Sequence, residues 1–214
     1  MQNTSSRIQY WNRVAPQKTF SHPLRADWLI NRLPRSARIL DVGCGYGRTL
    51  LQLFEAGYTN CLGLDFSAGM LDRCRNEVPG AAVVQNDGQG IPLHRESVDA
   101  VLLFAVLTCV PGDAEQLALM NEVWRVLRPN GLLYISDLLL NRDERNRERY
   151  ERCQARFGHY GVFELAEGVV VRHHSEEWIA GITRSYEQLE YEPFTVTTMN
   201  GNSSSALQYL GRKV

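Results

Sequence analysis

The chain has 214 residues, of which 44% are hydrophobic and 22% charged, and its formal net charge is −1 at pH 7. This length favours one domain with a sizeable core over two small ones. The near-neutral charge gives no electrostatic support for binding to nucleic acid or to an anionic membrane, so we expect neither as a partner.

Apolar runs alternate with helical patterns along the first part of the chain. The first apolar run ends at Val42 and leads into a turn with three glycines. Four further runs predict strands and three periodic patterns predict helices. The predicted strands are Cys61 to Asp65, Ala81 to Gln85, Ala100 to Phe104 and Leu132 to Leu138, and the predicted helices are Thr49 to Phe54, Ala68 to Arg75 and Ala114 to Val126.

The last of these helices has a clear apolar face, and a turn follows it. Arg128-Pro129-Asn130-Gly131 predicts that turn, which ends the helix before the fifth strand. Helical spacing predicts the buried face to consist of Leu117, Met120, Val123, Trp124 and Leu127.

The pattern changes after Leu140. The segment from Asn141 to Phe157 is dense in both signs of charge. A solvated helix that covers the site is the favoured interpretation, and a recognition surface for an acidic substrate is the alternative. Ser175 then begins a helix as its N-cap. Two alternating segments, Glu192 to Thr198 and Ala206 to Leu210, predict a closing antiparallel pair.

The alternation of strands and helices predicts an α/β fold with a doubly wound, mostly parallel sheet. Ligands of such sheets bind beyond the carboxyl ends of the strands, where the strand order reverses. We find no internal repeat, low-complexity segment or linker that would divide the chain, and we therefore expect a single domain.

Cysteine usage and the N-terminal segment favour the cytoplasm. Five cysteines are scattered without a Cys-x-x-Cys pair or a metal-like spacing to the histidines, which suits a reducing compartment and predicts no bound metal. The first nine residues are polar and lack the apolar core of a signal peptide. The longest apolar run, Val98 to Val110, contains Asp99 and is too short to span a bilayer.

The most informative stretch is Leu40-Asp41-Val42-Gly43-Cys44-Gly45-Tyr46-Gly47. Glycines permit a tight turn and a close approach of the backbone to a ligand, and the following helix N-terminus suits an anionic or carboxylate-bearing group. The stretch predicts a nucleotide-like ligand. Cys44 could serve as a nucleophile, but a small residue that fits the turn is the favoured interpretation because no histidine base is near it in sequence.

An acidic residue lies at or just after the end of each of the first three predicted strands. Asp41 precedes the first glycine, where it would repel a pyrophosphate and suits a ligand with an ammonium group. Asp65 ends the second strand, where a carboxylate can accept hydrogen bonds from both ribose hydroxyls. Asp87, after the third strand, is placed to accept from an adenine amine, although Asn86-Asp87-Gly88 is also typical of a plain turn.

At this point the chain resembles the class I S-adenosylmethionine-dependent methyltransferases of the small-molecule type. The stretch from Leu40 to Gly47 is similar to the first motif of that family almost letter for letter. Gly63-Leu64-Asp65-Phe66-Ser67 resembles the second motif and Asn86-Asp87-Gly88 the third. The segment from Glu122 to Leu132 resembles the helix and turn before the fifth strand.

The resemblance implies a seven-stranded Rossmann-like sheet with an antiparallel strand near the C-terminus. It also implies four parts of the single domain 1–214. These are an N-terminal lid or helical segment at 1–35, a cofactor-binding core at 36–140, a helical substrate-pocket insert at 141–175, and a closing helix and strands at 176–214.

The resemblance further implies S-adenosylmethionine as the cofactor and S-adenosylhomocysteine as the product. Asp41 and the turn around Cys44 would hold the methionine part, Asp65 the ribose hydroxyls, and the segment at 87–88 the adenine edge. The full set of cofactor-binding residues that it implies is Tyr10, Trp11, Asp41, Gly43, Cys44, Gly45, Asp65, Phe66, Met70, Asp87, Gly88 and Phe104, with Phe20 as a further lid residue.

The acceptor side is less family-like. Relatives often show two histidines after the fourth strand, where this chain has Thr108 and Cys109. A neutral acceptor must lose a proton, and the candidate bases are His173, His174 and Tyr160, with His159 behind them. Because adjacent residues of a strand face opposite sides, at most one of His173 and His174 should point into the pocket. A structural role for both is the alternative.

We therefore expect an enzyme, a monomer or homodimer, that methylates an oxygen or nitrogen atom of a small-molecule metabolite. Three alternatives stay open at this point. One is a nicotinamide-dependent reductase, against which the glycine spacing and Asp41 argue. The others are a non-catalytic protein that binds S-adenosylmethionine as a regulatory or partner subunit, and a methyltransferase with a protein or RNA acceptor.

Overall fold

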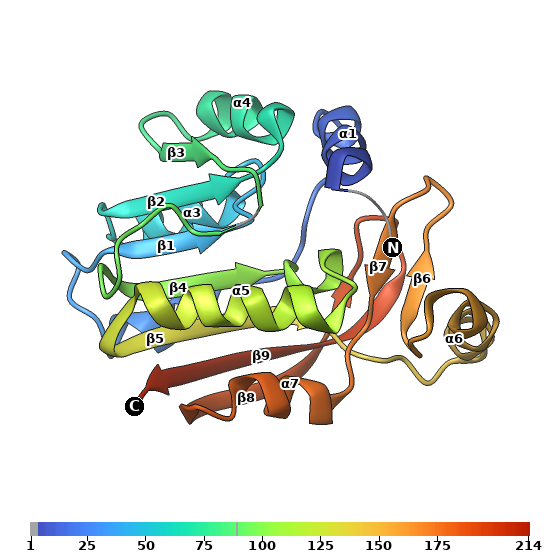
Figure 1. Ribbon diagram of the computed structural model, residues 1–214. Helices are drawn as coiled ribbons and strands as arrows, with labels where there is room; N and C mark the ends of the chain where they lie inside the picture. The colour runs from blue at the N-terminus through green and yellow to red at the C-terminus, as the bar shows by residue number, and fades with distance from the viewer. Residues whose placement is uncertain (1–3, 89) are drawn as a thin grey trace.

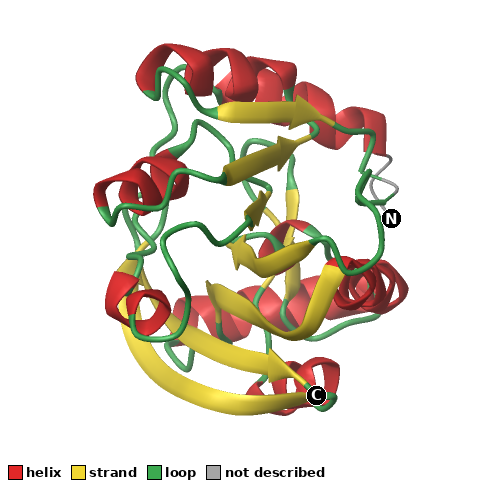
Figure 2. Cartoon of the chain, turned by 90° about the vertical axis from the view of Figure 1, so that its left-hand side faces the viewer, coloured by secondary structure: helices red, strands yellow, loops and turns green. Residues whose placement is uncertain are grey.

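The computed structural model describes residues 4–88 and 90–214. Its central feature is a seven-stranded sheet, in the order β3-β2-β1-β4-β5-β9-β8, with helices on both faces (Figures 1 and 2). The strands are β1 Ile39–Val42, β2 Cys61–Asp65, β3 Ala82–Gln85, β4 Val98–Phe104, β5 Leu127–Leu138, β8 Tyr186–Thr197 and β9 Ser203–Lys213, and β6 Val162–Glu164 pairs with β7 Val170–Arg172 in a separate hairpin. The helices are α1 Thr4–Val14, α2 Ala26–Ile30, α3 Arg48–Glu55, α4 Ala68–Glu77, the 3-10 turn η1 Leu107–Cys109, α5 Asp113–Val126, α6 Glu144–Phe157 and α7 Glu176–Thr183.

The sheet confirms the predicted fold class. Neighbouring strands from β3 to β5 run parallel, and β9 runs antiparallel to both β5 and β8. The strand order reverses between β1 and β4, so the carboxyl ends of these two strands flank the position where a doubly wound sheet binds its ligand. The predicted closing pair is also confirmed, although β8 and β9 are longer than the sequence pattern indicated.

Two hydrophobic cores cover the two faces of the sheet. One packs strand residues such as Leu103 and Ile135 against α5 and α7. The other packs residues such as Leu102 and Tyr134 against α2, α3 and α4. Neighbouring residues of a strand thus point into different cores, which explains why the central strands are apolar without a break.

Two details of the α5–β5 region were predicted wrongly. Leu117 is 47% exposed, because the buried face of α5 follows Gln116 and Met120 instead. The predicted turn lies inside β5, which already begins at Leu127. Its pairing with β4 jumps from Val98–Leu127 to Ala100–Leu132, and Asn130 within the bulge has a φ of 64°.

The region between β5 and α7 contains more than the helix that was predicted. Asp143 caps α6 by accepting from the backbone N–H of Asn146, and Gly158 ends the helix with a φ of 75°. The β6–β7 hairpin follows, which the sequence did not reveal. Ser175 caps α7 as predicted and accepts from the backbone N–H of Trp178. Every helix in the described part of the chain is too short or too polar to cross a membrane.

Gly47, at the start of α3, is closely packed against Cys74 of α4 and the neighbouring Val78. Gly47 has a φ of 86°, and a Cβ there would lie 2.4 Å from Cys74 Sγ and 3.0 Å from Val78 Cγ2. Gly80 has the same φ of 86°, but no described heavy atom lies within 4 Å of its Cβ position. Gly80→Ala should therefore cost about 1 kcal/mol of unfolding free energy, and Gly47→Ala roughly 1–3 kcal/mol more because it also overpacks the core. Urea titration of both variants measures this difference, and equal losses would show that the contact with α4 is not tight.

Candidate functional site

A cavity of about 190 Å³ lies beyond the carboxyl ends of β1, β2 and β4. One end is formed by the glycine turn and the ends of these strands. The other is formed by α6, the β6–β7 hairpin and the loop between β8 and β9. Nine of the predicted cofactor, lid and catalytic residues line it, namely Trp11, Phe20, Gly43, Gly45, Asp65, Phe66, Met70, Phe104 and His173.

The glycine turn owes its shape to left-handed backbone and to close packing. Gly43 and Gly45 have φ values of 69° and 54°. A Cβ on Gly43 would lie 2.8 Å from a methyl group of Val106, and one on Gly45 would lie 3.3 Å from the ring of Phe20. Both positions also line the cavity. Glycine is therefore required here both by conformation and by space.

Asp65 connects the turn to the end of β2. Its Oδ2 accepts from the backbone N–H of Gly45 at 2.9 Å and its Oδ1 accepts from that of Ser67 at 2.8 Å. Burial raises the pKa of Asp65, and these backbone donors oppose that shift. Each carboxylate oxygen has two lone pairs, so Asp65 can still accept from a ligand that carries neighbouring hydroxyls.

Asp41 is a buried carboxyl group with an unpaired oxygen. It is 1% exposed, and its Oδ2 has no hydrogen-bond partner among the described residues. It does not line the cavity itself, but Gly43, two residues later, does. Burial raises the pKa of Asp41 to about 7, and Arg48 only partly opposes this shift. A buried oxygen of this kind suits a ligand that supplies a cation or a hydrogen-bond donor.

Aromatic rings from the N-terminal segment close one wall. Trp11 and Phe20 both line the cavity and meet edge to face at 5.9 Å. Phe20 stacks on Tyr46 at 5.4 Å. Tyr10 does not reach the cavity. It packs behind Trp11 at 5.1 Å, and its hydroxyl donates to Glu167 of the hairpin loop at 3.4 Å.

Three other predicted cofactor residues lie outside the main cavity. Asp87 and Gly88 are exposed and follow β3, next to the end of β2. Their predicted role at an adenine edge stays a prediction. Cys44 is buried and lines a smaller hollow that shares Phe20 and Gly43 with the cavity. Burial raises the pKa of the Cys44 thiol well above its usual range, which supports the interpretation as a small residue that fits the turn.

The far end of the cavity lies partly in the segment 141–175, which the resemblance implied as a substrate-pocket insert, but its residues other than His173 were not predicted individually. Arg145, Asn146 and Arg149 of α6 line it together with the segments at 197–200 and 202–204 around the β8–β9 turn. The charge-rich pattern of α6 favoured a solvated helix. The β8–β9 turn is far along the chain from the glycine turn, and its local sequence did not indicate that it lines the cavity.

Among the candidate bases, only His173 lines the cavity. Its Nδ1 lies 2.6 Å from the hydroxyl oxygen of Tyr150 and 3.2 Å from Nδ2 of Asn141. The backbone N–H of Asn141 donates to that hydroxyl at 3.3 Å, so the hydroxyl hydrogen is free to point at Nδ1. The ring hydrogen is then on Nε2. Burial lowers the pKa of His173 to about 3, which keeps the ring neutral near pH 7.

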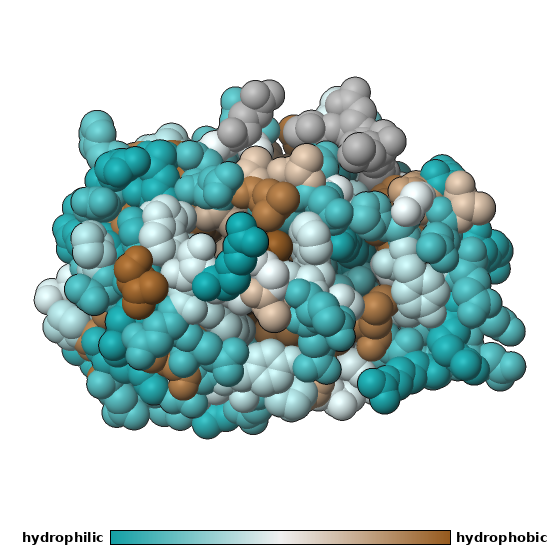
Figure 3. Space-filling model, turned by 60° about the horizontal axis from the view of Figure 1, so that its bottom comes forward, coloured by the Kyte–Doolittle hydropathy of each residue, from teal (hydrophilic) through white to brown (hydrophobic). Residues whose placement is uncertain are grey.

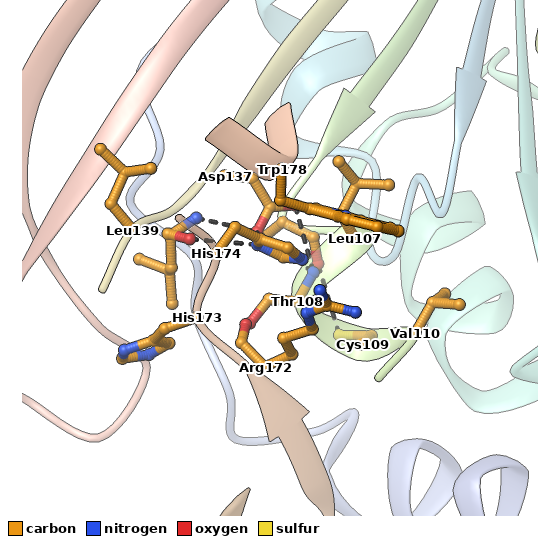
Figure 4. A network of polar contacts seen from close by, with 12 residues as sticks. Leu107, Thr108, Cys109, Val110, Asp137, Leu139, Arg172, His173, His174 and Trp178 are labelled. Carbon is orange, nitrogen blue, oxygen red and sulfur yellow. Dashed lines mark hydrogen bonds and ion pairs between the residues drawn. The ribbon is translucent and has the colours of Figure 1, made fainter. Parts of the chain in front are cut away.

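His174 points away from His173 into a buried polar network (Figure 4). Its Nδ1 lies 3.2 Å from the carbonyl oxygen of Leu138, and its Nε2 lies 2.8 Å from Nε2 of Gln116. The other amide atom of Gln116, Oε1, accepts from Trp178 Nε1 at 2.7 Å, so the amide N–H₂ faces the imidazole. Burial lowers the pKa of His174 to about 3. The network thus joins β5, α5 and α7.

Tyr160, the third candidate, is 40% exposed and does not line the cavity. Its ring packs edge to face on Tyr150 at 5.2 Å. Tyr160 and His174 do not line the cavity, and their predicted catalytic roles stay predictions.

Comparison with known proteins identifies a methyltransferase domain within the chain. The model of a methyltransferase domain matches residues 40–135. A phthiotriol/phenolphthiotriol dimycocerosates methyltransferase of Mycobacterium ulcerans is 38% identical over 110 residues, which are 47% of this chain and 37% of that protein. The malonyl-[acyl-carrier protein] O-methyltransferase of Enterobacter lignolyticus is 36% identical over 134 residues, which are 60% of this chain and 51% of that protein.

Another relative, the tRNA 5-carboxymethoxyuridine methyltransferase of Escherichia coli, is 35% identical over 107 residues, which are 47% of this chain and 40% of that protein. The chain thus spans about half the length, or less, of the curated relatives it matches. A SAM-dependent methyltransferase of Methanosarcina mazei shares the fold with a TM-score of 0.80 and 24% identity, over 86% of this chain and 95% of that one. These matches show that residues 40–135 of the chain form a methyltransferase domain, and that the chain has the fold of a SAM-dependent methyltransferase, with the glycine turn and Asp65 at one end of the cavity.

Proposed function

We propose that the chain transfers the methyl group of S-adenosylmethionine to an oxygen or nitrogen atom of a small-molecule metabolite. The observation that carries this proposal is the cavity with two different ends. One end presents Asp65 and the backbone of Gly43 and Gly45. The other is a partly polar chamber lined by α6 and the hairpin.

The residues at the first end fit S-adenosylmethionine, the cofactor of the family. Asp65 has lone pairs left for the ribose hydroxyls. Asp41 supplies a buried and unpaired carboxyl oxygen for the ammonium group. Phe66 and Met70 line the wall where the adenine would lie, and the carbonyl of Phe104 would face the ammonium group.

When bound, the cofactor supplies a methyl group that is already activated on a sulfonium. The chain then has to hold the acceptor atom in line with that methyl group and to exclude water. The cavity walls formed by Trp11, Phe104 and Phe163 are apolar, which supports such a dry environment.

The surroundings of the cavity support a small acceptor. Trp11 of α1 and Phe163 and Val171 of the hairpin line it, so that an acceptor bound there is flanked by both elements. The curated relatives carry names that refer to a lipid, an acyl-carrier protein and a tRNA. A macromolecule that inserts only a small group into the cavity is therefore the second candidate.

We infer that His173 acts as a hydrogen-bond donor to the acceptor. Its Nδ1 is taken by Tyr150, and its lowered pKa disfavours the uptake of a proton. The remaining Nε2–H can orient an oxygen or nitrogen atom of the acceptor.

The proposal is tested by isothermal titration with S-adenosylhomocysteine and with NADPH, followed by incubation with S-adenosylmethionine and a metabolite extract. We expect binding of S-adenosylhomocysteine only, and a methylated product by mass spectrometry. Binding of NADPH alone would support a reductase, and binding without any methylated product would support a non-catalytic role.

Asp65→Ala should weaken the binding of S-adenosylhomocysteine by roughly 10- to 100-fold, because it removes hydrogen bonds to a charged acceptor and leaves the turn amides unpaired. Asp72→Ala, on the exposed side of α4, is the matched control and should bind normally. Isothermal titration measures both affinities. An Asp65 variant that folds and binds like the control would refute the ribose assignment.

Asp41 should make cofactor binding dependent on pH. Below pH 7 the buried carboxyl of Asp41, with a pKa of about 7, is neutral and gains little from an ammonium group. Raising the pH through 7 ionises it, so the affinity for S-adenosylhomocysteine should increase between pH 6 and 7.5, by up to about tenfold per pH unit. Binding should release a proton at pH 6. Asp41→Asn should abolish both effects, and a pH dependence that survives this substitution would assign it to another group.

His173→Gln should lower the rate of methylation of the identified acceptor by about tenfold while leaving the affinity for S-adenosylhomocysteine unchanged. His174 is buried outside the cavity, so His174→Gln should instead lower the free energy of unfolding. Initial rates and urea titrations of both variants separate the two roles. The opposite pattern would restore His174 as the residue that acts on the acceptor.

A further inference from the structure

Two arginines of α6 line the cavity at the end opposite the glycine turn. Arg145 and Arg149 lie one helical turn apart and therefore share a face of the helix. Figure 1 shows α6 beyond the side of the sheet toward which β1, β2 and β4 point. Arg145 Nη1 donates to Asn202 Oδ1 at 2.6 Å, which ties α6 to the β8–β9 turn across the chamber.

Arg149 is held in place but is not fully paired. Its guanidinium lies 3.5 Å from the ring centroid of Phe163, and its Nη2 donates to Asn146 Oδ1. Its Nε is buried and hydrogen-bonds to none of the described residues. Burial lowers the pKa of Arg149. A buried N–H of a cation without an acceptor is costly, and a ligand that supplies one removes that cost.

The charged groups along the cavity are separated by sign. Among the lining residues that the structure describes, the charged ones are Arg145, Arg149 and Asp65. Asp65 is at the cofactor end, and both of its oxygens accept backbone N–H groups. Asp143 lies 3.9 Å from Arg145 Nε, but it caps α6 and does not line the cavity. The α6 end therefore presents positive charge without a lining carboxylate in the described part of the chain.

The wall between the two ends is apolar. Val106, Phe163, Leu165, Val171 and Met199 line it. A ligand that spans this chamber needs an apolar body, and its polar end has to match two guanidinium groups. A planar guanidinium binds a carboxylate or a phosphate through two parallel hydrogen bonds.

We propose that the methyl acceptor is an apolar molecule with one anionic group, a carboxylate or a phosphate, which Arg149 and Arg145 bind at the α6 end of the cavity. The role of this molecule as the methyl acceptor rests on the proposed function, whereas the anion site itself does not. The anionic group fixes the orientation of the molecule, so that its reacting atom lies toward Gly43 and Phe104.

The test uses four probes of one chain length, namely octanoate, octyl phosphate, 1-octanol and octylamine. Each is titrated into protein saturated with S-adenosylhomocysteine, so that the site for the cofactor's own carboxylate is filled. We expect octanoate or octyl phosphate to bind at least about tenfold more tightly than the neutral and cationic probes. Whichever anion binds more tightly identifies the head group.

Three variants locate the binding. Arg149→Gln should weaken the binding of the preferred anion by about tenfold or more. Arg145→Gln should weaken it less, since the side chain of Arg145 is 53% exposed, and that variant decides the question if Arg149→Gln does not fold. Arg147→Gln is the matched control. Arg147 is an exposed arginine of the same helix that does not line the cavity, and its loss should change nothing.

The proposal is wrong if 1-octanol or octylamine binds as tightly as the anions, if no anion binds, or if both cavity variants bind the anion like the Arg147 control. The same titrations without S-adenosylhomocysteine separate this result from the proposed function. A wild-type protein that binds octanoate through Arg149 but does not bind S-adenosylhomocysteine would refute the proposed function and leave the anion site intact.

Discussion

The site depends on one shared hydrogen-bond acceptor, the carbonyl oxygen of Leu64. It accepts the backbone N–H of Gly43 at 2.7 Å and that of Cys44 at 3.0 Å. These two bonds fold the chain after β1 back onto the end of strand β2. The N–H of Gly45 then lies within reach of Asp65, and the turn forms one end of the cavity. Only glycine at position 43 allows this path, because a side chain there would collide with Val106.

The other half of the cavity is built from parts that are distant in the chain. The hairpin is held to the core through Thr108, whose hydroxyl donates to the carbonyl oxygen of Arg172 at 2.6 Å and whose N–H donates to Asp137. Burial raises the pKa of Asp137 to about 7. Arg172 in turn lies over the ring of Trp178 at 4.6 Å. The end of the cavity at α6 and the hairpin thus depends on a polar network, whereas the end at β1 and β2 depends on a tight turn. The face that carries α7 and β8 is mostly hydrophilic, with apolar residues scattered over it in small groups (Figure 3).

The sequence predicted the local features of the site well and the long-range ones poorly. The glycine turn and Asp65 could be placed because strand, turn and acid are adjacent in the chain, and the position of Asp65 follows from the end of a strand. The sequence did not locate Arg149 in the cavity, because a charged helix looks the same whether it faces water or a chamber. Period-2 reasoning correctly allowed only one of the two neighbouring histidines to line the cavity, but it could not tell which one. The exposure of Leu117 was missed because helical spacing alone leaves the edge of an apolar face undefined.

Glu167 of the hairpin loop has a consequence for how fast ligands are exchanged. It accepts from Lys18 at 2.7 Å and from Tyr10 at 3.4 Å, and its backbone carbonyl accepts from Arg13 at 3.1 Å. These bonds fasten the N-terminal segment to the hairpin at the rim of the cavity. The bonds from Lys18 and Arg13 are exposed to solvent, and such exposed contacts are weak one by one, so the two segments are fastened by several weak contacts. Lid segments fastened by such weak contacts open on the microsecond-to-millisecond scale, so we expect ligands of the cavity to exchange on that scale without unfolding of the core.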